Sequence, residues 1–139
     1  MTAQTLTPRH SRKNEIAWVF DSFTAAALTA AADKHRWIVP FYLTIMEVYC
    51  SAGTAGSGGT SNIIDVHLNG TTIFTTQDNR PTLLTGDTGA FSLSGAGAVN
   101  MPPEVVSLKP GDILTYDVDQ ISTTGCALFA IAIVCSNVR

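Results

Sequence analysis

The chain has little charge, no long apolar run and no paired cysteines, and each shortage excludes a class of protein. Charged residues make up only 14% of the 139 residues, hydrophobic residues make up 45%, and the formal net charge is −3. Without an excess of positive charge there is no electrostatic case for nucleic-acid binding. The longest apolar run, Ala127–Cys135, is far shorter than the about 20 residues that span a membrane as a helix. It predicts a strand and no membrane partner.

Cysteine usage excludes a metal cluster or a redox motif by spacing. Cys50, Cys126 and Cys135 form no CxxC pair, and all three lie in or beside apolar runs. They are typical of small buried hydrophobic residues in a protein made in a reducing cytoplasm, and a disulfide through Cys50 remains open. The first residues, MTAQTLTPRHSRKNE, have no apolar core, so no secretion signal is expected.

Charge is unevenly placed along the chain. Basic residues crowd the start, where Arg9, Arg12 and Lys13 lie, while acidic residues dominate from Asp65 onward. We predict a polar N-terminal arm over residues 1–14, either solvated or lying on an acidic partner. Residues 15–139 are then one domain, in a chain long enough to bury roughly two-thirds of its surface on folding. The low charge indicates either a Thr/Ser/Gly-rich all-β protein or, as we favour, a surface covered by other subunits.

What the sequence has in abundance is short alternating apolar segments bounded by glycine and proline. Each alternates with the period of a strand, and together they predict about eight to ten strands of an antiparallel β-sandwich or barrel. Asn69-Gly70 predicts a two-residue type I′ hairpin, because both residues tolerate positive φ. The predicted strand segments are 15–23, 36–53 with a break near Pro40, 61–68, 71–75, 81–84, 90–94, 105–108, 112–121 and 127–135.

One segment has conflicting signals. The run TAAALTAAADK, residues 24–34, favours helix by alanine propensity. Leu28 is its only large apolar residue, however, so a helix here has almost nothing to bury. We therefore predict an extended chain.

The final strand is apolar on both faces. One face carries Phe129, Ile131 and Ile133, and the other carries Leu128, Ala130, Ala132 and Val134. A sheet face that meets water carries polar residues. We predict that the second face is a subunit interface covered by another copy of the chain, the alternative being a central strand of a thick monomeric core.

Candidate chemical sites are few. Asp65 and His67 share a strand face, as do Asp117 and Asp119, but neither pair has a third ligand by motif. No nucleophile–base arrangement and no phosphate-binding glycine loop is present. We predict no catalytic residues, no metal and no cofactor. The aromatic residues Trp18, Trp37 and Tyr49 offer a platform for sugar stacking, but core packing is the commoner use.

Several motifs taken together carry a resemblance. They are Pro40-Phe41 and Ile45, a glycine-rich loop, IIDVHLNGTTIFTTQDNRPTL (63–83), LKPGDILTYDVDQI (108–121) and an apolar last strand. In this order they resemble a family of small jelly-roll proteins of tailed-bacteriophage virions, over roughly the last three-quarters of the chain. Neither His67 nor the alanine-rich segment belongs to the pattern.

The resemblance implies an antiparallel jelly-roll β-sandwich with a structural role on the virion surface. Such domains serve as capsid decoration (cement) proteins, usually homotrimers bound to the major capsid protein, and as receptor- or glycan-binding modules of tail tips and fibres. No long shaft segment is present, which favours decoration. The protein would then be made in the host bacterial cytoplasm, and Arg9, Arg12 and Lys13 are our candidates for contact with the shell.

Overall fold

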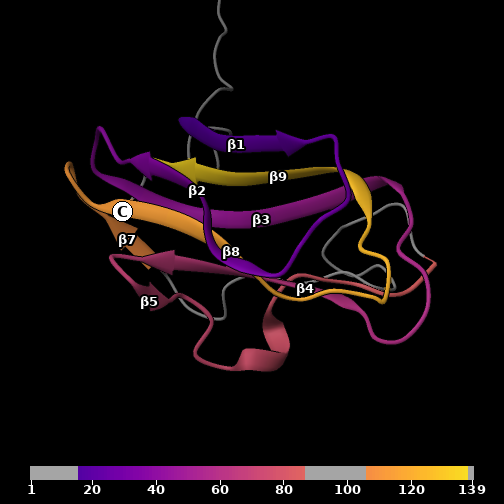
Figure 1. Cartoon of the computed structure of the whole chain (residues 1–139). Coiled ribbons are helices and arrows are strands. Elements are labelled where there is room, and N and C mark those ends of the chain that lie inside the picture. The colour runs from indigo at the N-terminus through magenta and orange to yellow at the C-terminus, as the bar shows by residue number, and fades with distance from the viewer. Residues whose placement is uncertain (1–15, 87–105, 138–139) are drawn as a thin grey trace, which may run out of the picture.

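Two antiparallel β-sheets packed face to face make up the described part of the chain, residues 16–86 and 106–137 of a computed structural model (Figure 1). Sheet A has the strand order β1-β9-β3-β7, formed by Trp18–Thr24, Ala127–Ser136, Leu43–Thr54 and Val106–Leu108. Sheet B has the order β2-β8-β4-β5, formed by Ala31–Ile38, Ile113–Gln120, Asn62–Leu68 and Thr71–Thr72. The short strand β6, Thr82–Leu83, also pairs with β4, and a 3-10 turn, η2, spans Gln77–Asn79. The prediction of an all-β sandwich is confirmed.

The core lies between the sheets because each strand sends alternate side chains inward. In Figure 1, β1, β9 and β3 form one layer above β4 and β5. Burying each large apolar side chain contributes about 1.5–3 kcal/mol relative to leaving it exposed. The buried side chains include Phe129, Ile131 and Ile133 of β9, Leu114, Tyr116 and Val118 of β8, and Ile64 and Val66 of β4. These are the inward faces that the alternation of apolar residues predicts.

A chain of aromatic rings joins the two sheets. The ring centroids of Phe20 and Trp37 are 6.2 Å apart, those of Trp37 and Tyr116 are 6.2 Å apart, and those of Tyr116 and Phe129 are 6.0 Å apart. The indole Nε1 of Trp37 also donates a hydrogen bond to the carbonyl oxygen of Asp21 at 3.2 Å. Trp37 therefore links the edge strands of both sheets and covers a backbone acceptor on the open edge of β1.

The predicted hairpin at Asn69-Gly70 is confirmed, with φ values of 51° and 89°. The predicted returning strand 71–75 is too long, because strand pairing ends at Thr72. Ile73 and Phe74 are both buried. Successive residues of a strand point to opposite faces, so two neighbouring residues reach one core only if the chain leaves strand geometry.

The alanine-rich segment forms no helix, as predicted. Residues 25–30 are irregular, and β2 starts at Ala31. Leu28 is 1% exposed, and its N–H donates to the carbonyl of Cys126 at 2.8 Å. A Cβ at Gly125 would clash with the Leu28 carbonyl oxygen, so only glycine allows this approach. Tertiary contact at one leucine overrides the helix propensity of its neighbours.

The N-terminal arm 1–14, with Arg9, Arg12 and Lys13, lies outside the described residues, and so does the predicted strand 90–94. The predicted strand 81–84 is shorter, Thr82–Leu83. The break at Pro40 is confirmed, since β2 ends at Ile38 and β3 begins at Leu43.

Candidate functional site

The outer face of sheet A carries the four residues of the predicted subunit interface. Leu128 is 44% exposed, and Ala130, Ala132 and Val134 are half-buried, whereas their odd-numbered neighbours point into the core. The two faces of β9 are therefore both apolar and only one is enclosed by the sandwich. That a second chain covers the other face stays a prediction.

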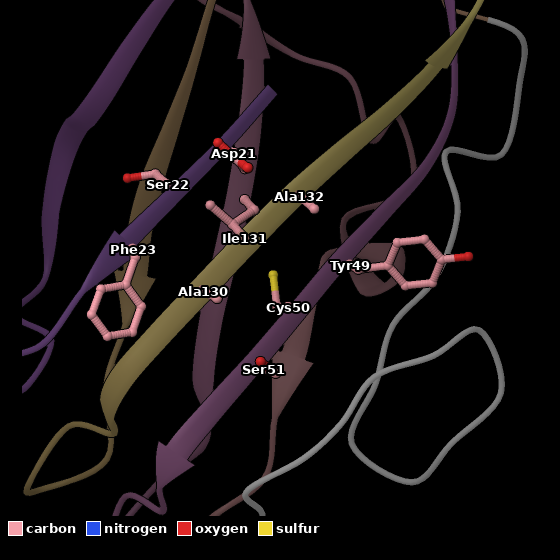
Figure 2. A pocket seen from close by; sticks show the side chains of 9 residues that line it. All are labelled: Asp21, Ser22, Phe23, Tyr49, Cys50, Ser51, Ala130, Ile131 and Ala132. Atoms are coloured by element: carbon pink, nitrogen blue, oxygen red, sulfur yellow. The ribbon is translucent and has the colours of Figure 1, made fainter. Parts of the chain in front are cut away.

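The pairing register places a strip of small residues at the centre of this face. Ala130 pairs with Phe23 of β1 and with Ser51 of β3, and Ala132 pairs with Asp21 and Tyr49 of the same two strands. A groove of about 500 Å³ runs over this strip, and Figure 2 shows its lining side chains along β1, β9 and β3. We call it the alanine groove.

Large apolar side chains stand on the same face beside the alanine groove. Phe23 is 62% exposed and Val19 is 41% exposed, and both belong to β1. In Figure 2 the ring of Tyr49 points from β3 away from β9. Apolar groups therefore gather on an outer sheet face, where an antiparallel sheet ordinarily carries polar side chains.

Leu128 has a backbone conformation that few leucines adopt, with φ at +52°. Such a conformation costs about 1–2 kcal/mol for an L-residue with a side chain. A Cβ at Gly53 on β3 would lie 2.9 Å from the Leu128 Cβ, so a residue without a side chain leaves room for the leucine. Leu128 is thus fixed beside the alanine groove but outside its lining.

The outer face of sheet B is polar, and the structure brings together three of the four residues considered there as metal ligands. The Nε2 atom of His67 lies 3.4 Å from Asp65 Oδ2, and its Nδ1 atom lies 3.4 Å from Asp117 Oδ2. Both distances are long for hydrogen bonds, and the contacts are ion pairs only where the imidazole carries a proton on each nitrogen. The fourth residue, Asp119, pairs with Arg80 at 2.6 Å.

Asp65 is nearly buried, and its carboxylate accepts two short hydrogen bonds. Its Oδ1 accepts from the Thr72 hydroxyl at 2.6 Å and from the Val66 N–H at 2.7 Å, and the residue is 3% exposed. Burial raises the pKa of this carboxyl above its ordinary value, against the lowering effect of the Thr72 hydrogen bond. The Asp117 carboxylate accepts from the Asp33 N–H at 2.8 Å. The arrangement joins β4, β8 and β2 across the sheet.

Neither a metal centre nor a reactive thiol is found in the part of the chain that the structure describes. No group of three or more His, Cys, Asp or Glu side chains there is placed to hold a metal ion. Cys50, Cys126 and Cys135 are buried and free, which answers the question of a Cys50 disulfide. Burial raises the pKa of Cys135 to about 12, so this group is a thiol and not a thiolate at neutral pH.

Sequence reasoning found β9 but missed the rest of the groove. Phe23, Asp21, Tyr49 and Ser51 belong to it only because β1 and β3 flank β9, and no local pattern indicates that pairing. It named Trp18, at the start of β1, as a candidate for sugar stacking but missed the exposed ring of Phe41 beside it. Trp18 and Phe41 form an edge-to-face pair with centroids 5.4 Å apart, and they are 40% and 52% exposed.

No protein-family model, no curated protein and no solved structure matches this chain. Within residues 16–86 and 106–137, no helix has the length and apolar character needed to cross a membrane.

Proposed function

We propose that this protein is a capsid decoration protein of a tailed bacteriophage, a jelly-roll β-sandwich that binds the assembled shell as a homotrimer and stabilises it. The strand connections support the jelly-roll assignment. Apart from the two-residue strands β5 and β6, successive strands alternate between the sheets along the chain, with β1, β3, β7 and β9 in sheet A and β2, β4 and β8 in sheet B. Paired Greek keys generate such alternation.

The observation that carries the proposal is the apolar outer face of sheet A. A protein that acts by assembly needs a surface that neighbouring subunits cover, and the strip formed by Ala130, Ala132 and Val134 with Phe23 beside it meets this need. The resemblance of the hairpin and 108–121 motifs to virion jelly-roll proteins supplies the biological setting.

The proposed mechanism is thermodynamic. A trimer that bridges neighbouring shell subunits binds only the assembled lattice, so it stabilises that lattice by mass action. Rupture of the shell then requires the added interfaces to break as well. The basic arm supplies an electrostatic contact to the shell, which salt screens.

The main experiment locates the protein and counts its copies. Light scattering of the purified chain should give a trimer, and electron microscopy of phage particles that carry the protein should place it on the shell at regular lattice positions. Absence from the shell, with density at the tail instead, contradicts decoration.

The arm has its own test. Replacing Arg9, Arg12 and Lys13 by alanine should weaken shell binding and flatten its dependence on salt concentration. The control replaces Lys34 and Arg36 by alanine, removing basic residues from the exposed β2 edge instead. Equal binding by the arm variant and the wild type removes the arm from the mechanism.

A second candidate function is a receptor- or glycan-binding module of the phage tail. The observation that favours it is the exposed aromatic group of Trp18, Phe41 and Tyr42, of which Tyr42 is 55% exposed, because sugars stack on such rings. Binding to host cell-wall polysaccharide that is lost in Trp18→Ala and Phe41→Ala, but kept in Phe23→Ala, favours this function over decoration.

A further inference from the structure

From the outer face of sheet A we infer that Phe23 is the anchor of self-association, and that it enters the alanine groove of a neighbouring copy. The inference rests on the proposed homotrimer and deepens it by assigning the two contacting parts. Both parts are present on every copy, so each subunit in a closed ring supplies one Phe23 and receives another.

The groove fits an apolar ring better than a polar ligand. Its floor is lined by the methyl groups of Ala130 and Ala132, between strands that pair with β9 on either side. Sites for small polar ligands present several converging hydrogen-bonding groups. Here the one charged side chain on the lining is the exposed carboxylate of Asp21, and the hydroxyl-bearing residues Ser22, Tyr49 and Ser51 lie on the flanking strands and not on the alanine floor.

Phe23 has the properties of the matching part. It is the most exposed large apolar side chain of β1, at 62%. It forms part of the wall of its own groove, directly across from Ala130. The ring is therefore free to enter the groove of another copy, and a few residues in well-packed, desolvated pockets carry most of the binding energy of protein interfaces.

Leu128 extends the same surface. Its strained backbone and the missing side chain at Gly53 hold an exposed leucine next to the floor of the groove. Strain that the fold sustains at an exposed apolar residue is typical of functional positions. We assign Leu128 to the rim that surrounds the bound ring.

The first experiment removes the anchor. Sedimentation equilibrium of Phe23→Ser should give a dissociation constant at least about tenfold higher than that of the wild type. The matched control is Ile38→Ser, at a 69% exposed residue that ends β2 and lies off sheet A, with an expected change of less than about threefold. Thermal unfolding of both variants checks that the fold is retained, as expected for exposed positions. Ala132→Phe, which fills the groove, should weaken association as Phe23→Ser does.

The second experiment tests the contact itself. Maleimide labelling of the Ala132→Cys chain, which keeps Phe23, should slow as protein concentration rises, because the ring of a neighbouring copy covers the new thiol. The double variant Phe23→Ser/Ala132→Cys should lose this protection. The three native cysteines are buried and free, so wild-type chains serve as the background.

The outcomes separate the inference from the proposed function. If the wild type associates but Phe23→Ser associates equally well, or if Phe23→Ser leaves the maleimide protection of Ala132→Cys unchanged, the anchor is wrong while the oligomer stands. If the wild type is a monomer at high concentration, the proposed homotrimer fails and the inference fails with it. A monomeric Ala132→Cys variant whose new thiol is shielded from maleimide only by shell particles assigns the groove to the shell and also overturns the inference.

Discussion

The outer faces of the two sheets differ in how their side chains are satisfied. On sheet B, the buried carboxylates of Asp65 and Asp117 face His67 from either side, and hydrogen bonds from Thr72 and from the Asp33 backbone hold them. Every one of these contacts lies within the chain. The charged side chains at the centre of that face therefore have their partners within the chain.

On sheet A, the outer face consists of alanines and a valine on β9, with exposed Phe23 and Val19 on β1. Exposing these apolar side chains to water is unfavourable. Covering them would contribute about 25 cal/mol of free energy for each Å² of apolar surface removed from water. The comparison teaches that the same sandwich pairs the charged side chains of one outer face and leaves apolar side chains exposed on the other, which is the face that we propose for association.

The largest expected effect is the difference in stability between a substitution on the inner face of β9 and one on its outer face. Ile131→Ala should lower the free energy of unfolding by about 2–5 kcal/mol, because the side chain is 1% exposed and its removal leaves a cavity. Ala132→Ser, one residue along on the outer face, should change it by less than about 0.5 kcal/mol. Urea denaturation at low protein concentration measures both. Similar losses at the two positions would mean that the outer face is core.

An intermediate effect is expected on sheet B. His67→Ala leaves the nearly buried Asp65 and Asp117 without the group between them, and should destabilise by about 1–3 kcal/mol. The value lies below that for a fully buried pair because the His67 side chain is 24% exposed. The control is Arg36→Ala, which removes an exposed pair with Asp33 and should cost less than about 1 kcal/mol. If His67→Ala is no less stable than Arg36→Ala, the contacts of His67 with the two carboxylates do not stabilise sheet B.

The smallest expected effect is on the pH dependence of stability, which should have opposite signs for Asp65 and for Asp112, a residue at the turn before β8. Burial raises the pKa of Asp65, so its ionisation costs stability, and the cost disappears as pH falls toward the unfolded pKa of about 3.9. The hydrogen bond from Lys109 lowers the pKa of Asp112, so its contribution is lost as pH falls through the lowered value.

The stability of wild type relative to Asp65→Asn should therefore rise between pH 7 and pH 4, and relative to Asp112→Asn it should fall as pH drops below about 4. Unfolding by urea at a series of pH values measures both differences. If both differences change in the same direction with pH, burial does not set the pKa of Asp65.

Much of the fold was predictable because local patterns act over a few residues. Alternation in 61–68 and 112–121 correctly predicted the strands β4 and β8, and Asn69-Gly70 predicted its turn. The length of the returning strand was not predictable, since burial of both Ile73 and Phe74 depends on the core that they enter.

By itself, the sequence determined most of the strand positions, the Asn69-Gly70 turn and the two apolar faces of β9, because the period of side chains along a strand is a local property. Only the tertiary structure decided that β1 and β3 flank β9, which turns two alanines into a groove and places Phe23 at its wall. It alone also brought Asp65, His67 and Asp117 together. Pairing between distant strands is set by the whole core, and no short stretch of sequence contains it.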